Sequence, residues 1–125
     1  MTRRVLVVDD EPHIRLLILQ ALEELEAEGV EFSSAANGQQ ALELIKTEHP
    51  RLVFLDIMMP VMSGFDVCRA VKRELGFSDV HVVLLTAKGQ EVDRQKGAEV
   101  GADVYMTKPF DPDELLQRAR QVLGL

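Results

Sequence analysis

Cysteine is almost absent from this 125-residue sequence, which carries only Cys68. One thiol cannot form an internal disulfide, and the composition suits a reducing cytoplasm. Cys68 lies in an apolar stripe, where packing is its expected role. Long apolar runs are missing as well: none approaches the roughly 20 residues that span a bilayer, and the first run is too short for a signal peptide. We therefore expect a cytoplasmic protein without membrane attachment.

The sequence also lacks a cluster of lysine and arginine residues. Its formal net charge is −7, so the chain has no electrostatic reason to bind nucleic acid or an anionic membrane. A protein partner or a small cation such as Mg²⁺ suits this charge better. The three histidines show no metal-ligand spacing, and we interpret them as structural or surface residues: His13, His49 and His81.

Internal repeats, low-complexity segments and linkers are absent too, so we expect a single domain over residues 1–125. Apolar residues make up 46% of the chain and charged residues 28%, which is typical of a folded globular domain. A chain of this length is long enough to bury a hydrophobic core.

What the sequence does contain is a fivefold alternation of short apolar runs and segments with helical periodicity. The predicted strands cover residues 5–8, 31–35, 52–55, 82–85 and 104–106. Helices are expected to begin near Pro12, Asn37, Ser63, Gln90 and Asp111, and Asn37, Ser63 and Asp111 are suitable N-caps. The apolar residues of the first helix recur at three- and four-residue steps: Ile14, Leu17, Ile18, Ala21, Leu22 and Leu25.

This alternation predicts an α/β fold with a parallel sheet and helices on both faces. The unbroken apolar runs of the first, third and fourth strands indicate central positions, and the more polar second and fifth strands should form the edges. We therefore predict a five-stranded parallel sheet with the flavodoxin-like order 2-1-3-4-5. The helix over residues 90–100 has few apolar residues and should be the least firmly docked.

Polar residues follow the predicted strands at the points where they end. Asp9 and Asp10 follow the first strand, Asp56 the third, Thr86 the fourth, and Lys108 lies near the end of the fifth. Carboxyl ends of parallel strands share one edge of the sheet, so these side chains should meet at the switch point between the first and third strands.

Three carboxylates at one edge repel one another unless a positive charge offsets them. A divalent cation with oxygen ligands fits this requirement, and Mg²⁺ is our predicted cofactor. A metal, an ammonium group and a hydroxyl are what phosphoryl transfer needs, and one carboxylate can itself be the nucleophile. We choose Asp56, because Asp9 and Asp10 form a pair suited to the metal.

Each of these residues also has a purely structural interpretation. Asp9 and Asp10 are suited to capping the first helix, Asp56 to a loop, Thr86 to a turn and Lys108 to the surface. Their joint placement at strand ends favours a functional site, because no structural requirement places all of them on one edge.

Four segments of the chain resemble receiver domains of two-component response regulators, the CheY-like family. They are VLVVDDEP, LVFLDIMMPVMSGFDV, VVLLTAKG and GADVYMTKPF, and the resemblance runs from Val5 to Leu123. It implies a domain that accepts a phosphoryl group from a sensor histidine kinase or phosphotransfer protein and controls an effector protein or a fused output domain. Such a domain is not an enzyme beyond its own phosphorylation and dephosphorylation.

The resemblance also implies roles for the acidic residues and the loop after them. Asp56 would be the phosphoacceptor. Asp10 and Asp56 would bind Mg²⁺ directly, together with the backbone carbonyl of Met58, and Asp9 would act through water. Gly64 matches a glycine in the loop that follows the phosphorylated strand.

Further implied roles concern the fourth and fifth strands. Thr86 would hydrogen-bond a phosphoryl oxygen, and Lys108 would pair with the phosphoryl group. The Lys108–Pro109 peptide bond is expected to be cis, as is usual in the family. Thr86 and Tyr105 would form the switch that changes the face made by the fourth helix, the fifth strand and the fifth helix.

Two residues that flank the site vary within the family and set the lifetime of the phosphoryl group. Met58 and Lys88 replace polar or acidic side chains that fast-hydrolysing members carry, so we predict a long-lived phosphoryl group. Four charges resemble the set with which one subfamily forms a phosphorylation-promoted homodimer, and we keep this dimer as an alternative: Arg94, Asp103, Glu114 and Arg118.

Three other functions compete with this interpretation. A phosphohydrolase of the haloacid-dehalogenase type needs a second aspartate two residues after the nucleophile, where this chain has Met58. A nucleotide- or flavin-binding module would carry a GxGxxG or GxxxxGK[ST] loop, and neither motif is present. A degenerate receiver that serves only for docking would not need the intact aspartates, threonine and lysine. The sequence does not identify the kinase or the output, nor does it separate a stand-alone regulator from a fragment.

Overall fold

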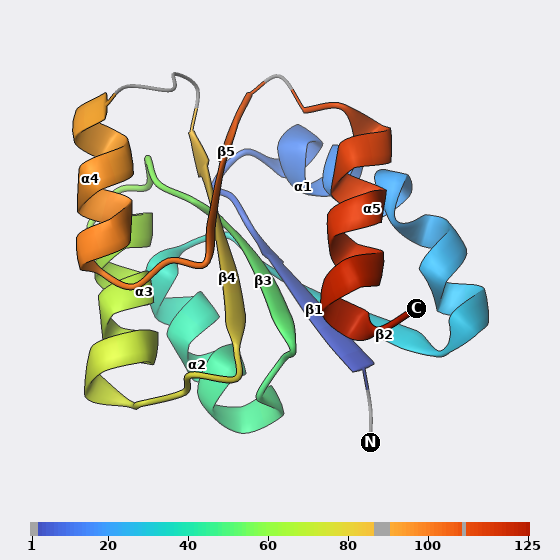
Figure 1. The fold of residues 1–125 in the computed structure, drawn as a ribbon, viewed down its shortest axis with the longest axis horizontal. Helices are drawn as coiled ribbons and strands as arrows, with labels where there is room; N and C mark the ends of the chain where they lie inside the picture. The colour runs from blue at the N-terminus through green and yellow to red at the C-terminus, as the bar shows by residue number, and fades with distance from the viewer. Residues whose placement is uncertain (1–2, 87–90, 109) are drawn as a thin grey trace.

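The computed structural model describes residues 3–86, 91–108 and 110–125. Its core is a five-stranded parallel sheet with the order β2-β1-β3-β4-β5, which confirms the predicted topology (Figure 1). The strands are β1 Arg3–Val8, β2 Val30–Ala35, β3 Leu52–Asp56, β4 His81–Thr86 and β5 Val104–Thr107.

Helices cover both faces of this sheet, as Figure 1 shows. Packing places α1 and α5 on one face, and α2, α3 and the end of α4 on the other. The helical elements are α1 Pro12–Ala21, η1 Glu23–Glu28, α2 Gly38–Glu48, α3 Gly64–Arg69, η2 Ala70–Glu74, α4 Glu91–Glu99 and α5 Pro112–Leu123. No helix in the described part of the chain has the length and apolar content needed to cross a membrane.

The central strands are buried on both faces, as their unbroken apolar runs predicted. Every residue of β3 is buried, and neighbouring side chains point to opposite faces of the sheet. Phe54 packs in the core under α1 and α5, whereas Leu55 packs in the core under α2 and α3. Asp56 therefore lies at the end of a strand that is buried on both faces.

The predicted N-caps are confirmed at three helices. The side chain of Asn37 accepts a hydrogen bond from the N–H of Gln40. Ser63 and Asp66 form a reciprocal capping box at the start of α3. Asp111 accepts from the N–H of Asp113 at the start of α5. These hydrogen bonds satisfy N–H groups that the first helical turn leaves without partners.

The first helix differs from its prediction in two respects. It ends at Ala21 and is followed by the 3₁₀ segment η1, in which Leu25 is buried. Leu17 was assigned to its apolar face but is 43% exposed, as is Leu16 at 55%. Residues 16–19 are four consecutive apolar residues, and a straight helix can turn only part of such a run toward one sheet face.

The third helix also changes form along its length. After α3, the π-helical segment η2 continues the helix, and the N–H of Leu75 donates to the carbonyl of Ala70 at 2.8 Å. Phe65, Cys68 and Val71 are buried, as their spacing predicted. The packing role expected for Cys68 is confirmed, because its side chain is fully buried and the burial raises the pKa of the thiol to about 11.

The glycine at the start of α3 provides a test of how tightly the site is built. A Cβ at Gly64 would lie 2.3 Å from the backbone oxygen of Asp56, which cannot move without shifting β3. We expect Gly64→Ala to lower the free energy of unfolding by about 1–3 kcal/mol, measured by urea denaturation. Gly97→Ala in α4 is the matched control: its Cβ would meet the flexible Leu84 side chain at 3.3 Å, and helix propensity offsets the contact. Equal effects of the two substitutions would contradict this expectation.

Candidate functional site

The carboxyl edge of the sheet collects the polar residues that the sequence places at its strand ends. Asp9 and Asp10 follow β1, Asp56 ends β3 and Thr86 ends β4. Lys108 follows β5 directly. Because β1 and β3 are neighbours in the sheet, the aspartates meet at the point where the strand order reverses.

The ammonium group of Lys108 lies between two buried carboxylates. Its Nζ is 3.2 Å from Oδ2 of Asp9 and 3.4 Å from Oδ1 of Asp56. Asp9 is fully buried and Asp56 is 3% exposed. The lysine thus connects the ends of two strands that lie more than a third of the chain apart in sequence, and it partly neutralises the charge of the two carboxylates.

Asp10 adds a third carboxylate on the solvent side of this pair. Oxygen atoms of Asp9, Asp10 and Asp56 all lie within 4.8 Å of one another, and Asp10 is exposed. One cation can therefore contact carboxylates that belong to two different strands while it remains open to solvent. Among the described residues, this arrangement is consistent with the metal site that the strand ends predicted.

Burial makes the charged forms of the aspartates unfavourable. Burial, together with repulsion from Asp9, raises the pKa of Asp56 from 3.8 to about 6, although Lys108 and the N–H of Met58 oppose this rise. Burial also raises the pKa of Asp9, although the hydrogen bond from the N–H of Glu11 and the charge of Lys108 act to lower it. Burial alone would lower the pKa of Lys108, but the two carboxylates outweigh it and raise the value. The cluster is thus short of positive charge.

The end of β5 is attached to β4 by a backbone hydrogen bond beside the cluster. The N–H of Lys108 donates to the carbonyl of Thr86 at 2.6 Å. Thr86 is 4% exposed, so its side chain lies at the buried side of the cluster. This bond explains how a lysine after a short edge strand reaches the centre of the sheet.

The loop between β3 and α3 covers the other side of the cluster. Ile57 and Met59 are buried, whereas Met58 is 74% exposed. Val61 has a positive φ of 71°, which is unfavourable for a β-branched residue, and its side chain is fully exposed. Met58 therefore lies beside Asp56 without being held in the core.

Of the two residues that the resemblance assigns to the switch, Tyr105 contacts α4. The guanidinium of Arg94 lies 4.8 Å from the centre of the Tyr105 ring, and Tyr105 is partly buried. Of the four charged residues considered for a dimer, Asp103 already forms an ion pair and a hydrogen bond within the chain. Its Oδ2 lies 2.8 Å from Lys72 Nζ and accepts a hydrogen bond from the N–H of Val82.

One residue of the site was missed by the sequence analysis. Arg15 donates to the backbone carbonyl of Asp9 at 2.6 Å and so fixes the turn that carries Asp9 and Asp10. Its position just over one helical turn after Asp10 is the only signal in the sequence. Two predicted features lie outside the described residues, namely Lys88 and the cis bond at Pro109.

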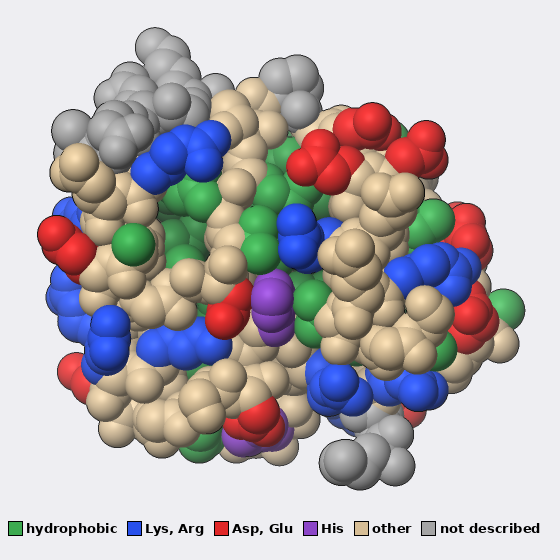
Figure 2. Space-filling view, viewed as in Figure 1, with side chains coloured by type: hydrophobic (Ala, Val, Ile, Leu, Met, Phe, Trp, Pro, Cys, Tyr) green, Lys and Arg blue, Asp and Glu red, His purple; other side chains and the backbone are tan. Residues whose placement is uncertain are grey.

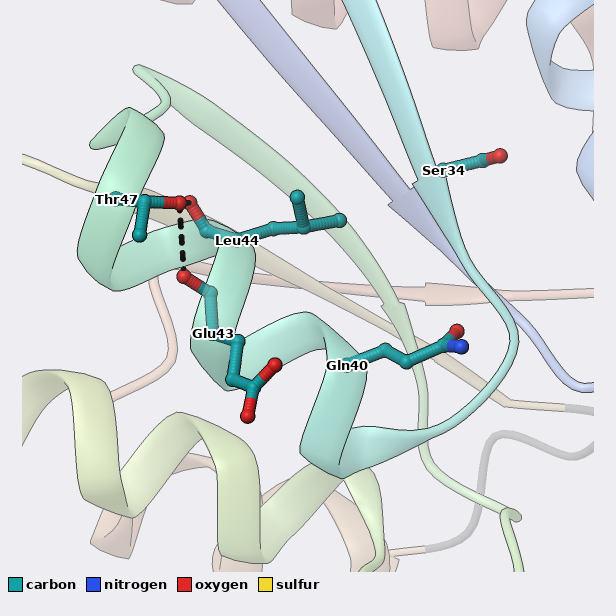
Figure 3. Close-up of a pocket in the computed structure, with 5 residues that line it drawn as sticks. All are labelled: Ser34, Gln40, Glu43, Leu44 and Thr47. Atoms are coloured by element: carbon teal, nitrogen blue, oxygen red, sulfur yellow. Dashed lines mark hydrogen bonds between the residues drawn. The ribbon is translucent and has the colours of Figure 1, made fainter.

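A surface pocket elsewhere contains none of these residues. It lies between β2 and α2 and is lined by Ser34, Gln40, Glu43, Leu44 and Thr47 (Figure 3). The Thr47 hydroxyl donates to the carbonyl of Glu43 at 3.0 Å, an ordinary helix contact. This pocket therefore adds no residue to the cluster at the carboxyl edge of the sheet.

Known proteins show the same fold and related sequences. The chain is 45% identical over 121 residues to the phosphate regulon transcriptional regulatory protein PhoB of Pseudomonas aeruginosa, covering 97% of this chain and 52% of that protein. It is 40% identical over 124 residues to the alkaline phosphatase synthesis transcriptional regulatory protein PhoP of Bacillus subtilis, covering 98% of this chain and 49% of that protein. The chain thus spans about half the length of these curated relatives.

A solved structure and a family model agree with these relatives. The chemotaxis protein CheY4 of Vibrio cholerae superposes with a TM-score of 0.86 at 32% identity, covering 98% of this chain and all of that one. The family model described as the response regulator receiver domain matches residues 5–120. With its fold, its strand-end residues and its relatives in agreement, the chain belongs to the receiver domains of two-component response regulators.

Proposed function

We propose that this receiver accepts a phosphoryl group on Asp56 from a histidine kinase or phosphotransfer protein, in a Mg²⁺-dependent reaction. The observation that carries the proposal is the buried Asp56 carboxylate in contact with Lys108, beside Asp9 and Asp10. The phosphorylated form then changes the face made by α4, β5 and α5 and controls an output domain or effector protein. Apart from its own phosphorylation and dephosphorylation, the domain catalyses no reaction.

The transfer itself uses the carboxylate of Asp56 as the nucleophile. One of its oxygens bonds to phosphorus while the phosphorus–nitrogen bond of the donor phosphohistidine breaks, which leaves an acyl phosphate. Lys108, 3.4 Å from Asp56, pairs with the transferred group. The hydroxyl of Thr86 at the end of β4 hydrogen-bonds one of its oxygens. These residues position the group and offset its charge, which is the main requirement of phosphoryl transfer.

The donor set at the edge fits Mg²⁺. Three carboxylates and one ammonium leave two negative charges, which a single divalent cation balances. Asp10 and Asp56 would hold the ion together with the Met58 carbonyl, and Asp9 would act through water. When bound, Mg²⁺ withdraws charge from the phosphoryl oxygens.

The signal leaves the site through Thr86 and Tyr105. Thr86 moves toward the phosphoryl group, and the space it vacates allows the Tyr105 ring to turn inward. Two contacts support this route: Arg94 stacks on the Tyr105 ring, and Lys108 joins the end of β5 to β4. Tyr105 lies near Gly97 of α4, and the described part of that helix, residues 94–99, buries no side chain larger than glycine.

A homodimer through this face is a second, weaker proposal. Figure 2 shows acidic side chains gathered near the start of α5, where Asp111, Asp113 and Glu114 are exposed. Arg94 and Arg118 would supply the opposite charges. Asp103 fits the dimer less well, because it is already paired with Lys72. Surface ion pairs contribute little singly, so only the full set would favour association.

The first prediction tests the acceptor directly. Incubation with a small-molecule phosphodonor and Mg²⁺ should add one phosphoryl group to the intact mass. Asp56→Asn and addition of EDTA should each abolish the gain, because they remove the nucleophile and the cation. Glu43→Gln, an exposed carboxylate on α2, is the matched control and should behave like the parent protein. A phosphoryl gain in Asp56→Asn would disprove the assignment of Asp56.

The second prediction concerns stability without metal. The folded state holds the proton of Asp56 up to about pH 6, whereas the unfolded chain loses it near the ordinary value of 3.8. The free energy of unfolding should therefore fall as the pH rises through this window. Above it, Asp56→Asn should be more stable than the parent by on the order of 3 kcal/mol in EDTA.

Urea denaturation at pH 7.5 and pH 4 measures this difference, which should shrink at the lower pH. Added Mg²⁺ should stabilise the parent far more than Asp56→Asn. An equal stability of the two proteins at pH 7.5 in EDTA would show that Asp56 is not destabilised by its surroundings.

The third prediction concerns the lifetime of the phosphoryl group. The exposed thioether of Met58 borders the acceptor and offers no hydrogen bond to position an attacking water. We expect Met58→Asn to speed phosphoryl loss about three- to tenfold, which is roughly 0.7 to 1.4 kcal/mol in the barrier. Met58→Leu keeps an apolar side chain and should match the parent in a time course of intact mass. Identical rates for all three proteins would remove Met58 from the determinants of lifetime.

A further inference from the structure

We propose that Lys72 and Arg73 of the π-helical segment η2 are positioning residues that hold the C-terminal end of α4, so that α4 turns about this end when the domain switches. The holding function is independent of phosphorylation. The turning motion rests on the function proposed above.

Lys72 holds the connection between α4 and β5. Its side chain is 9% exposed, and its Nζ lies 2.8 Å from Oδ2 of Asp103 and 2.5 Å from the carbonyl oxygen of Val80. The same oxygen of Asp103 accepts a hydrogen bond from the N–H of Val82 at 2.8 Å. The N–H of Asp103 donates to the carbonyl of Val82 at 3.0 Å. The segment after α4 is thereby attached to the start of β4, deep in the sheet.

Arg73 holds the last residue of the helix itself. Its guanidinium donates to the carbonyl of Glu99 at 3.1 Å. Carbonyls in the last turn of a helix have no partner within it, and a positive charge there is favourable to the helix dipole. Gly101 follows with a φ of 89°, and a Cβ there would lie 3.2 Å from Cβ of Lys72. The two chain segments therefore approach each other closely at this point.

The packing of α4 also changes along its length. Val100, directly after the helix, is 2% exposed, and its carbonyl contacts Sγ of Cys68 at 3.6 Å. Within residues 94–99, whose side chains the structure describes, only Gly97 is buried. The end of α4 that joins β5 is thus anchored by charge and by packing, whereas its described body has little apolar contact to resist movement.

The two adjacent residues that reach the end of α4 belong to the π-helical segment η2. A π turn holds more residues than an α turn, and such turns occur often at functional positions. In Figure 1 the end of α4 that continues into β5 lies beside the helix formed by α3 and η2.

Amide hydrogen exchange, resolved by residue with NMR, tests the holding function. We expect Lys72→Met and Arg73→Gln to raise exchange at residues 97–103 at least fivefold without metal or phosphodonor. Exchange in β1 and β3 should stay unchanged, which separates a local effect from global unfolding. Arg73→Lys keeps the charge and should restore most of the protection. The control Arg69→Gln alters an exposed basic residue of α3 that lies 4.0 Å from Asp66, and it should have no effect at residues 97–103. Unchanged exchange in both test variants would overturn the proposal.

A second measurement tests the turning motion. The parent protein is compared with and without Mg²⁺ and beryllofluoride, a phosphoryl analogue. On addition of the analogue, amide exchange in the parent should change at residues 94–96 and stay constant at residues 97–103. In Arg73→Gln, amide exchange should change in both segments. A change in the parent that is largest at 97–103 would place the pivot elsewhere and overturn the proposal. Calorimetry that detects no binding of the analogue would contradict the proposed function instead, while the comparison without metal still decides the holding function.

Discussion

The ammonium of Lys108 between the carboxylates of Asp9 and Asp56 is the interaction on which the remainder of the site depends. Two buried carboxylates on neighbouring strands repel each other, and without an opposite charge they would favour separation of β1 from β3 at this edge. One lysine offsets only part of this repulsion, as the raised pKa of Asp56 shows. The remaining demand for positive charge supports the divalent cation and the phosphoryl transfer that we propose for this site.

The sheet supplies rigidity where this chemistry needs it. β1, β3 and β4 are buried on both faces, so the ends that carry Asp9, Asp56 and Thr86 cannot shift without disturbing the core. β5 is an edge strand with one neighbour, and it carries both Tyr105 and the approach to Lys108. This difference in burial supports the proposed route of the signal along β5 rather than through the central strands.

The neighbouring helix gives this edge a second point of attachment. Lys72 and Arg73 connect η2 to the end of α4, and Asp103 takes part through both its side chain and its N–H. Asp103 was also considered for a dimer contact. Its carboxylate cannot pair fully with Lys72 and with a second copy of the chain at the same time. A contact with another copy of the chain would have to replace an ion pair in which Lys72 is largely buried and Asp103 is partly exposed, so several new charges would have to pair at once.

The fold and most of the site could be predicted from the sequence because they depend on local pattern. Apolar runs bounded by Asp9, Asp56 and Thr86 indicated buried parallel strands, and the sheet order followed from which runs were unbroken. Strand-end residues then had to share one edge, whatever the details of packing. The contact between Lys108 and the two aspartates follows from that topology, although its distances do not.

Other features depend on which segments pack against each other in the folded chain, and the local sequence pattern does not predict that packing. Leu17 has the spacing of a core residue but is exposed, because the sheet accepts only part of the apolar run in α1. The π form of η2 was not predicted. Arg15 bonds to the Asp9 carbonyl and Lys72 pairs with Asp103, and the spacing of these residues in the sequence does not predict either contact. The sequence by itself determined the order of the strands and the chemistry at their ends, since hydrophobic periodicity is a property of neighbouring residues. Only the tertiary structure decided which helix ends are held and by which charges, since those contacts exist only once distant segments have packed.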